Sequence, residues 1–115
     1  MIEKIVIDYL SKKLNVPVFM GERPTRNLDE YIVIQTIDGG RRDLIDAVTF
    51  NIYSYSNTSL LNSAEINEQV KKAMFDIIEL PEISASKCGG GGQNIDTTTK
   101  TYAYNCVFNL FYMED

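Results

Sequence analysis

The stretch that decides the fold is IDAVTFNIYSY, residues 45–55. Val48, Phe50 and Ile52 occupy every second position in it, and polar residues or tyrosines fill the positions between them. Successive side chains of a strand point to opposite faces of a sheet, so this alternation predicts a half-buried β-strand. Such a strand needs a neighbour to pair with, and the chain on either side supplies candidates.

The preceding stretch YIVIQTI, residues 31–37, predicts the first partner strand. It is dense in β-branched and aromatic residues, which favour strands. The polar segment DGGRRD, residues 38–43, follows it. Glycine pairs among polar residues are typical of turns. The sequence therefore predicts an antiparallel hairpin with an exposed turn over residues 38–43.

Two segments carry the helical period. Apolar residues at positions 2, 5, 6, 9 and 10 share one helical face, and Asn15 and Pro17 end that pattern. Capping side chains at positions 57–59 begin a second helix, whose apolar positions 66, 70, 73, 74 and 77 continue until Pro81. Residues 16–20, between the first helix and the first long strand, are expected to form a short strand.

The C-terminal third predicts two more strands. Residues 82–87 suit a short strand that leads into Gly89–Gly92, and four glycines are too flexible to favour regular structure. Residues 97–112 form a long strand with Tyr102, Tyr104, Cys106, Phe108, Leu110 and Tyr112 on one face. That aromatic face is expected to pack in the core or to form a sticky interface. Base stacking is disfavoured because the chain is acidic.

The two cysteines, Cys88 and Cys106, are expected to be reduced and partly buried. A hairpin that turns near Asn94 and Ile95 places Cys88 opposite about Thr101 and Cys106 opposite about Ile83, which separates the thiols. Two cysteines in a chain of this size also make no disulfide framework.

Together these elements predict one α+β domain over residues 1–115, in the order αβ(β)βαββ. A mostly antiparallel β-sheet with two α-helices packed on one face satisfies this order, because every element then buries one apolar side. At 115 residues with 44% hydrophobic and 23% charged residues, the chain is typical of a single globular domain.

The charge balance disfavours several kinds of partner. The formal net charge is -5 and the pI is about 4.7, whereas a grip on nucleic acid requires a surplus of lysine and arginine. No apolar run approaches the roughly 20 residues that span a bilayer, so no membrane partner is expected. The first ten residues alternate charged and apolar side chains unlike a signal peptide, and a cytoplasmic product is expected.

No motif for catalysis, cofactor binding or metal binding is complete. The chain has no histidine, which removes the commonest general base and metal ligand. Gly89–Gly92 lack the Lys-Ser/Thr pair of a phosphate loop, and Cys88 has only Lys87 beside it to lower its pKa. Asp38, Asp43 and Asp46 do not match a calcium-loop spacing. We therefore expect no enzyme activity and no cofactor.

The pattern of elements resembles the tail terminator proteins of long-tailed phages, also described as tail completion, minor tail or head-tail joining proteins. The resemblance rests on a short N-terminal helix, the strand YIVIQTI running into Gly39-Gly40, and an arginine-containing turn. The strand AVTFNIY, residues 47–53, a helix with Ala64 and Ala73 on its inner side, a variable hairpin and a long aromatic strand complete it. It covers roughly residues 2–112.

The resemblance implies a structural role in the virion. Such proteins form a ring, typically of six copies, which caps the head-proximal end of the tail tube, stops tube polymerisation and provides the surface on which the head docks. The implied partners are further copies of the chain, the major tail tube protein and a head completion or neck protein. DNA passes through without specific binding, and an acidic lumen would repel it. The expected location is the virion tail, reached from the host cytoplasm during assembly.

Exposed, adaptable loops often carry partner contacts, so the two glycine segments are the predicted assembly interface. Its residues are Gly39, Gly40, Arg41, Arg42, Asp43, Gly89, Gly90, Gly91 and Gly92. Three alternatives stay open: a neck or head-tail connector protein of similar composition, a small intracellular adaptor that binds a peptide by strand addition, and a small carboxylate-based enzyme.

Overall fold

The computed structural model describes residues 2–24, 28–42, 45–96 and 101–113. Its elements in chain order are α1 (Ile2–Lys13), β1 (Val18–Met20), β2 (Glu30–Arg42), β3 (Ile45–Ser56), α2 (Leu60–Asp76), the short 3-10 helix η1 (Ile77–Glu79), β4 (Ile83–Asp96) and β5 (Thr101–Tyr112). The predicted order of helices and strands is confirmed.

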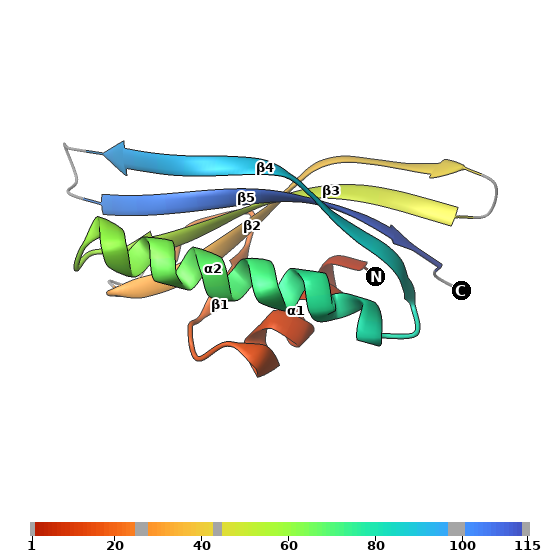
Figure 1. Ribbon diagram of the computed structural model, residues 1–115, viewed down its shortest axis with the longest axis horizontal. Coiled ribbons are helices and arrows are strands. Elements are labelled where there is room, and N and C mark those ends of the chain that lie inside the picture. The colour runs from red at the N-terminus through yellow and green to blue at the C-terminus, as the bar shows by residue number, and fades with distance from the viewer. Residues whose placement is uncertain (1, 25–27, 43–44, 97–100, 114–115) are drawn as a thin grey trace.

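The five strands form one sheet in the order β1-β2-β3-β5-β4. β1 runs parallel to β2, and every other neighbouring pair is antiparallel. Both helices lie on one face of the twisted sheet, and the β2–β3 and β4–β5 hairpins extend toward opposite ends of the molecule (Figure 1). The predicted α+β class, with two helices on one face of a mostly antiparallel sheet, is confirmed.

The main core lies between the helices and the sheet. The alternation of β3 places Phe50 and Ile52 on this face with no exposed surface, and the same face of β5 contributes Phe108. α2 begins where the Ser59 hydroxyl accepts a hydrogen bond from the Asn62 backbone N–H at 3.0 Å, which satisfies one unpaired donor of its first turn. The fully buried apolar side chains that α1 and α2 contribute to this core are Val6, Leu10, Val70 and Met74.

A second, smaller cluster occupies one end of the opposite sheet face. Tyr31, Val33, Tyr55 and Ala103 are buried there. The Tyr31 and Tyr55 rings stack with centroids 4.8 Å apart, and the Arg23 guanidinium lies 4.8 Å from the centroid of the Tyr55 ring. Residues of the β1–β2 connection therefore cover this end, although no described helix does.

The predicted turn over residues 38–43 is wrong for its first five residues, which continue β2. Gly39 pairs with Val48 and Gly40 with Ala47, so the chain reverses between Arg42 and Ile45. The alternating pattern of β3 begins at Ile45, and pairing from there onward satisfies the backbone N–H and C=O groups along β3. Pairing along the whole of β3 therefore outweighs the turn preference of the glycines. Asp43 lies outside the described residues.

The prediction that Gly89–Gly92 form no regular structure is also wrong, because they belong to β4. Gly90 and Gly91 have φ values of 127° and 154°, a conformation that favours glycine. A Cβ atom on Gly91 would lie 2.1 Å from the Asn105 carbonyl oxygen. The glycines thus allow a close approach of two backbones, and β5 gains a partner along its whole length.

The predicted pairing of the cysteines is wrong in register, although both thiols are free as expected. Cys88 lies opposite Phe108, and Cys106 lies opposite Gly91. The chain reverses between Asp96 and Thr101, beyond the predicted turn at Asn94 and Ile95, which moves every partner along β5. Cys106 is buried in the main core and Cys88 is exposed.

Candidate assembly interface

The two predicted glycine segments lie toward opposite edges of the sheet. Gly39–Arg42 belong to β2 and Gly89–Gly92 to β4, with β3 and β5 between these two strands. The fold does not bring the segments together within one chain. Each lies instead in a strand with an outer edge, and the properties of those edges decide what the segments can bind.

β4 forms one edge of the sheet. No described strand pairs with its outer side, so backbone N–H and C=O groups of this 14-residue strand face outward, although the Ile83 N–H already donates to the Leu80 carbonyl at 3.1 Å. Natural edge strands are commonly blunted by proline, by charged side chains or by bulges. β4 contains no proline, and Lys87 and Asp96 are its charged residues. Gly89, Gly90, Gly91 and Gly92 are all exposed.

β2 has an outer edge that β1 covers only in part. β1 pairs with Ile32–Ile34, and the Gly21 N–H donates a hydrogen bond of 2.8 Å to the Ile34 carbonyl just beyond it. From residue 35 to residue 42, no strand of the described chain lies on this side. Ile37 interrupts the pairing with β3 as a bulge, and its side chain is 57% exposed.

Register shifts that indicate bulges interrupt both edges. In β4 they fall between Ile83 and Ala85 and between Cys88 and Gly90, so that Gly89 has no opposite residue in β5. A bulge increases local twist and can blunt an edge. The β4 bulge at Gly89 carries no side chain, however, and it leaves the outer backbone accessible.

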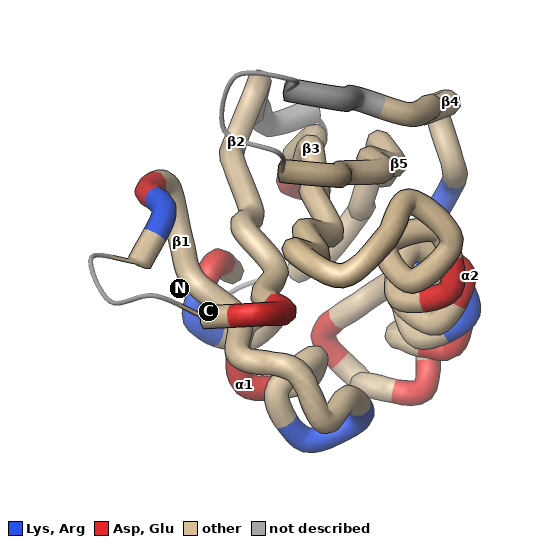
Figure 2. The backbone as a smooth tube through the Cα atoms, turned by 90° about the vertical axis from the view of Figure 1, so that its left-hand side faces the viewer, with Lys and Arg blue, Asp and Glu red and all other residues tan. Residues whose placement is uncertain are grey.

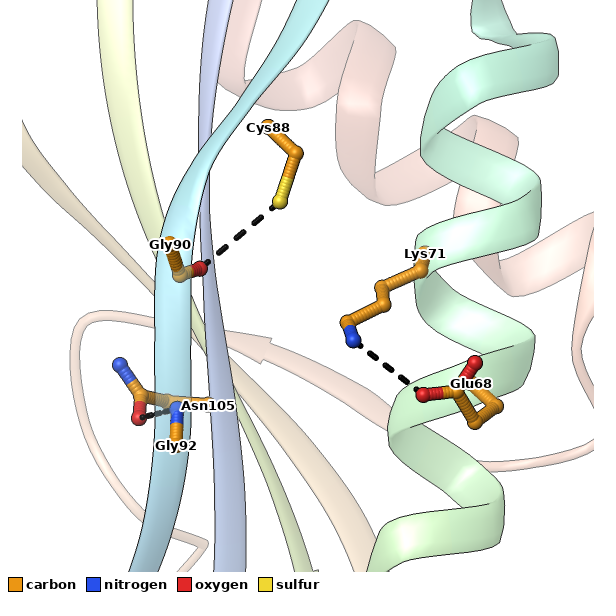
Figure 3. A network of polar contacts seen from close by, with 6 residues as sticks. All are labelled: Glu68, Lys71, Cys88, Gly90, Gly92 and Asn105. Atoms are coloured by element: carbon orange, nitrogen blue, oxygen red, sulfur yellow. Dashed lines mark hydrogen bonds and ion pairs between the residues drawn. The ribbon is translucent and has the colours of Figure 1, made fainter.

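The sheet face opposite the helices carries a polar network that sequence reasoning missed. The Gly92 N–H donates to Asn105 Oδ1 at 3.2 Å (Figure 3), the Asn105 amide donates to Asn51 Oδ1 at 2.9 Å, and the Asn51 amide donates to Tyr53 Oη at 3.0 Å. The Thr49 hydroxyl donates to Asn109 Oδ1 at 2.7 Å. The available signal was Asn51 of β3 together with Asn105 and Asn109 of β5, whose spacing of four places them on one face of the strand.

On this face the two central strands carry no charged residue. Asp46 is the only charged residue in β3 and shares the helix face with Phe50, and β5 contains none. Figure 2 shows the charged residues concentrated on the helices and the connections. Lys87 of β4 lies with its Nζ atom 5.9 Å from the centroid of the Phe111 ring. The face therefore presents amides, hydroxyls and aromatic rings.

The surroundings of Cys88 include a lysine of α2. Its thiol and the Lys71 side chain point into the same space between β4 and α2 (Figure 3), but the Lys71 Nζ atom is paired with Glu68 Oε1 at 3.2 Å. That hydrogen bond to Glu68 raises the pKa of Lys71, which keeps the lysine protonated and unable to act as a base. Cys106 is buried, which raises the pKa of its thiol to about 12.

Within the described ranges, no group of three or more acidic or cysteine side chains is placed to hold a metal ion. Asp43 lies outside those ranges, so the structure does not bring the three aspartates of residues 38–46 into one described site. No helix of the described chain has the length and hydropathy needed to cross a bilayer.

Comparison with known proteins adds no family. No protein-family model matches the chain, and no curated protein matches it.

Proposed function

We propose that the protein is a structural protein of a long-tailed phage, a tail terminator whose copies close into a ring at the head-proximal end of the tail tube. The observation that supports this function is the pair of partly uncovered edges on opposite sides of one sheet, formed by β2 and β4. The resemblance of the sequence to tail terminator proteins is the reason for proposing this particular ring.

Two different edges on one chain favour a head-to-tail contact. In such a contact, one surface of each copy binds a different surface of the next copy, and the arrangement closes into a ring when the rotation allows it. A peptide-binding adaptor uses a single open edge, whereas a head-to-tail ring uses two. Two partly uncovered edges on one chain meet the requirement of the ring.

The charge of the chain suits a ring through which DNA moves. A formal net charge of -5 gives no electrostatic grip on phosphates, and the two central strands carry amides and hydroxyls with Asp46 as their only charge. Neutral polar groups contact water readily and contribute no positive charge that attracts a polyanion. Such a surface allows the genome to slide past without specific binding.

The test of this function is tube capping. The purified protein is added to polymerising major tail tube protein of the same phage, and tube lengths are measured by electron microscopy. We expect shorter tubes that carry a ring at one end. The matched variant changes Arg41 and Arg42 together to glutamate, which reverses charge at the distal end of β2 and is expected to abolish capping while the circular dichroism spectrum is kept.

Tubes of unchanged length with the wild-type protein contradict the terminator function. A ring that binds head or neck protein without stopping tube growth indicates a neck connector instead. A persistent monomer that binds a peptide tightly indicates the adaptor.

A further inference from the structure

We infer that neighbouring copies in the ring join by antiparallel pairing of two edges: residues 35–42 of β2 in one copy with residues 83–90 of β4 in the next. This inference rests on the proposed function, because it names the contact that builds the proposed ring. The occupant of each edge is thus a second copy of the same chain.

The strand directions fit this contact. β2 is antiparallel to β3, β3 to β5 and β5 to β4, so β2 and β4 run in opposite directions within one copy. Rotation about an axis parallel to the strands preserves the direction of each strand. The β4 edge of one copy therefore meets the β2 edge of its neighbour in antiparallel orientation, which is slightly more stable per residue than parallel pairing.

The heights of the two edges along the strands also match. Thr36 pairs with Phe50, Phe50 with Phe108 and Phe108 with Cys88. Thr36 and Cys88 therefore stand at the same height along the strands, at the two opposite edges of the sheet. Gln35 and Gly90 share a level in the same way, because Asn51 and Val107 connect them across the two central strands. Gly40 and Ala85 also share a level, connected by Ala47 and Phe111. A rotation without a shift along the axis thus brings the uncovered part of β2 beside residues 83–90.

The formal charges along the two edges are complementary at one of these levels. Asp38 pairs with Thr49, Thr49 with Asn109 and Asn109 with Lys87. An acidic residue of one edge thus shares its level with the basic residue of the other.

Close approach of a neighbouring backbone is unobstructed at the glycine end of this segment. No heavy atom lies within 4 Å of the position that a Cβ atom would occupy on Gly90. The bulges at Ile37 and Gly89 each lie next to the level that Thr36 and Cys88 share. A bulge increases the local twist of a strand, so both edges change their twist at nearly the same height.

A two-fold dimer through two β4 edges is the competing arrangement. It also gives antiparallel strands, but it leaves residues 35–42 of β2 uncovered in both copies and cannot extend into a ring. The two arrangements differ in which residues approach Cys88. Thr36 lies near Cys88 in the ring contact, whereas in the dimer Cys88 approaches only residues of another β4.

The experiment is cross-linking of Thr36→Cys to the native Cys88 with a short bismaleimide. Both positions are exposed and lie on the helix side of the sheet at one level. Within one copy they are separated by three strand spacings, about 14 Å, which a short cross-linker does not span. Covalent products must therefore join different copies, and a denaturing gel resolves them as a ladder.

The matched control is Gln35→Cys, which is also an exposed position in the same edge but lies on the opposite face of the sheet. Its side chain must cross the thickness of the sheet to reach Cys88, so we expect at least roughly tenfold less product than from Thr36→Cys. Adding Cys88→Ser to Thr36→Cys should abolish the ladder.

Each outcome decides the inference. A ladder from Thr36→Cys that depends on Cys88 supports it. Rings that form without that ladder, or with equal yields from Thr36→Cys and Gln35→Cys, overturn the edge contact and leave the ring intact. Cross-linked wild-type dimers through Cys88 alone, without rings, indicate the β4 dimer and overturn it. A monomer at all concentrations overturns the proposed function and the inference together.

Discussion

At the scale of single residues, the two cysteines show how the fold separates chemically identical groups. Cys106 has no exposed surface, and its burial, with a smaller contribution from Cys88, raises the pKa of its thiol to about 12. Cys88 is exposed in the edge strand. One thiol is therefore a core residue, while the other is a native probe of the β4 surface.

The raised pKa of Cys106 predicts a stability that falls at high pH. Between about 9 and 12, the unfolded chain loses the thiol proton while the folded chain keeps it, so the unfolded state binds fewer protons and gains stability. The contribution is complete below pH 9 and declines above it by at most about 1.4 kcal/mol per pH unit. Tyr9 and Tyr31, whose pKa values burial also raises, act in the same direction.

Urea unfolding between pH 8 and pH 10.5 measures this dependence. Cys106→Ala should make the decline in the free energy of unfolding less steep, and Cys88→Ala serves as the control that removes an exposed thiol. Equal slopes in the two variants would show that Cys106 does not carry the effect.

At the scale of elements, β4 departs furthest from what its sequence predicts. Position 91 requires glycine for two reasons: its φ is positive, and the Asn105 carbonyl oxygen occupies the space that a Cβ atom would need. Gly92 has no positive φ, and no atom lies within 4 Å of the place that a Cβ atom on it would occupy. The four glycines look alike in sequence. The roles of these two differ because one of them lies against a backbone and the other does not.

Alanine substitutions separate these roles. Gly91→Ala should lower the free energy of unfolding by at least about 2 kcal/mol, because its Cβ meets a backbone atom that cannot move aside and its φ is strained. Gly92→Ala should change it by less than about 1 kcal/mol, with a gain expected from the reduced entropy of the unfolded chain. Chemical denaturation of both variants is the measurement, and similar losses in the two would refute the close approach at Gly91.

The helices and the central strand β3 could be predicted because each has an amphipathic period of its own. The layered arrangement could then be predicted because each of these elements has one apolar side to bury. The extensions of β2 and β4 could not, since Gly39, Gly40 and Gly89–Gly92 favour turns locally and are held in strands by long-range pairing. For the same reason the segments predicted as an assembly interface differ in form from the prediction. They are edges of a sheet and not loop tips.

At the scale of the whole molecule, the shape is elongated, with principal extents of 45 × 24 × 23 Å. The long axis contains the two hairpins, and the uncovered edges lie on either side of it (Figure 1). A subunit with this geometry can contact one neighbour through each edge and keep both hairpin ends available for proteins above and below. A subunit that binds its neighbours through its edges and other proteins through its hairpin ends suits a ring between a tail tube and a head.

The central claim is that copies of this chain close into a ring, and native mass spectrometry combined with negative-stain electron microscopy tests it most directly. Over a rising protein concentration, we predict one discrete oligomer, expected to contain six copies, which appears in class averages as a closed ring. A protein that remains monomeric at the highest concentration, or that forms open filaments of variable length, would contradict the account.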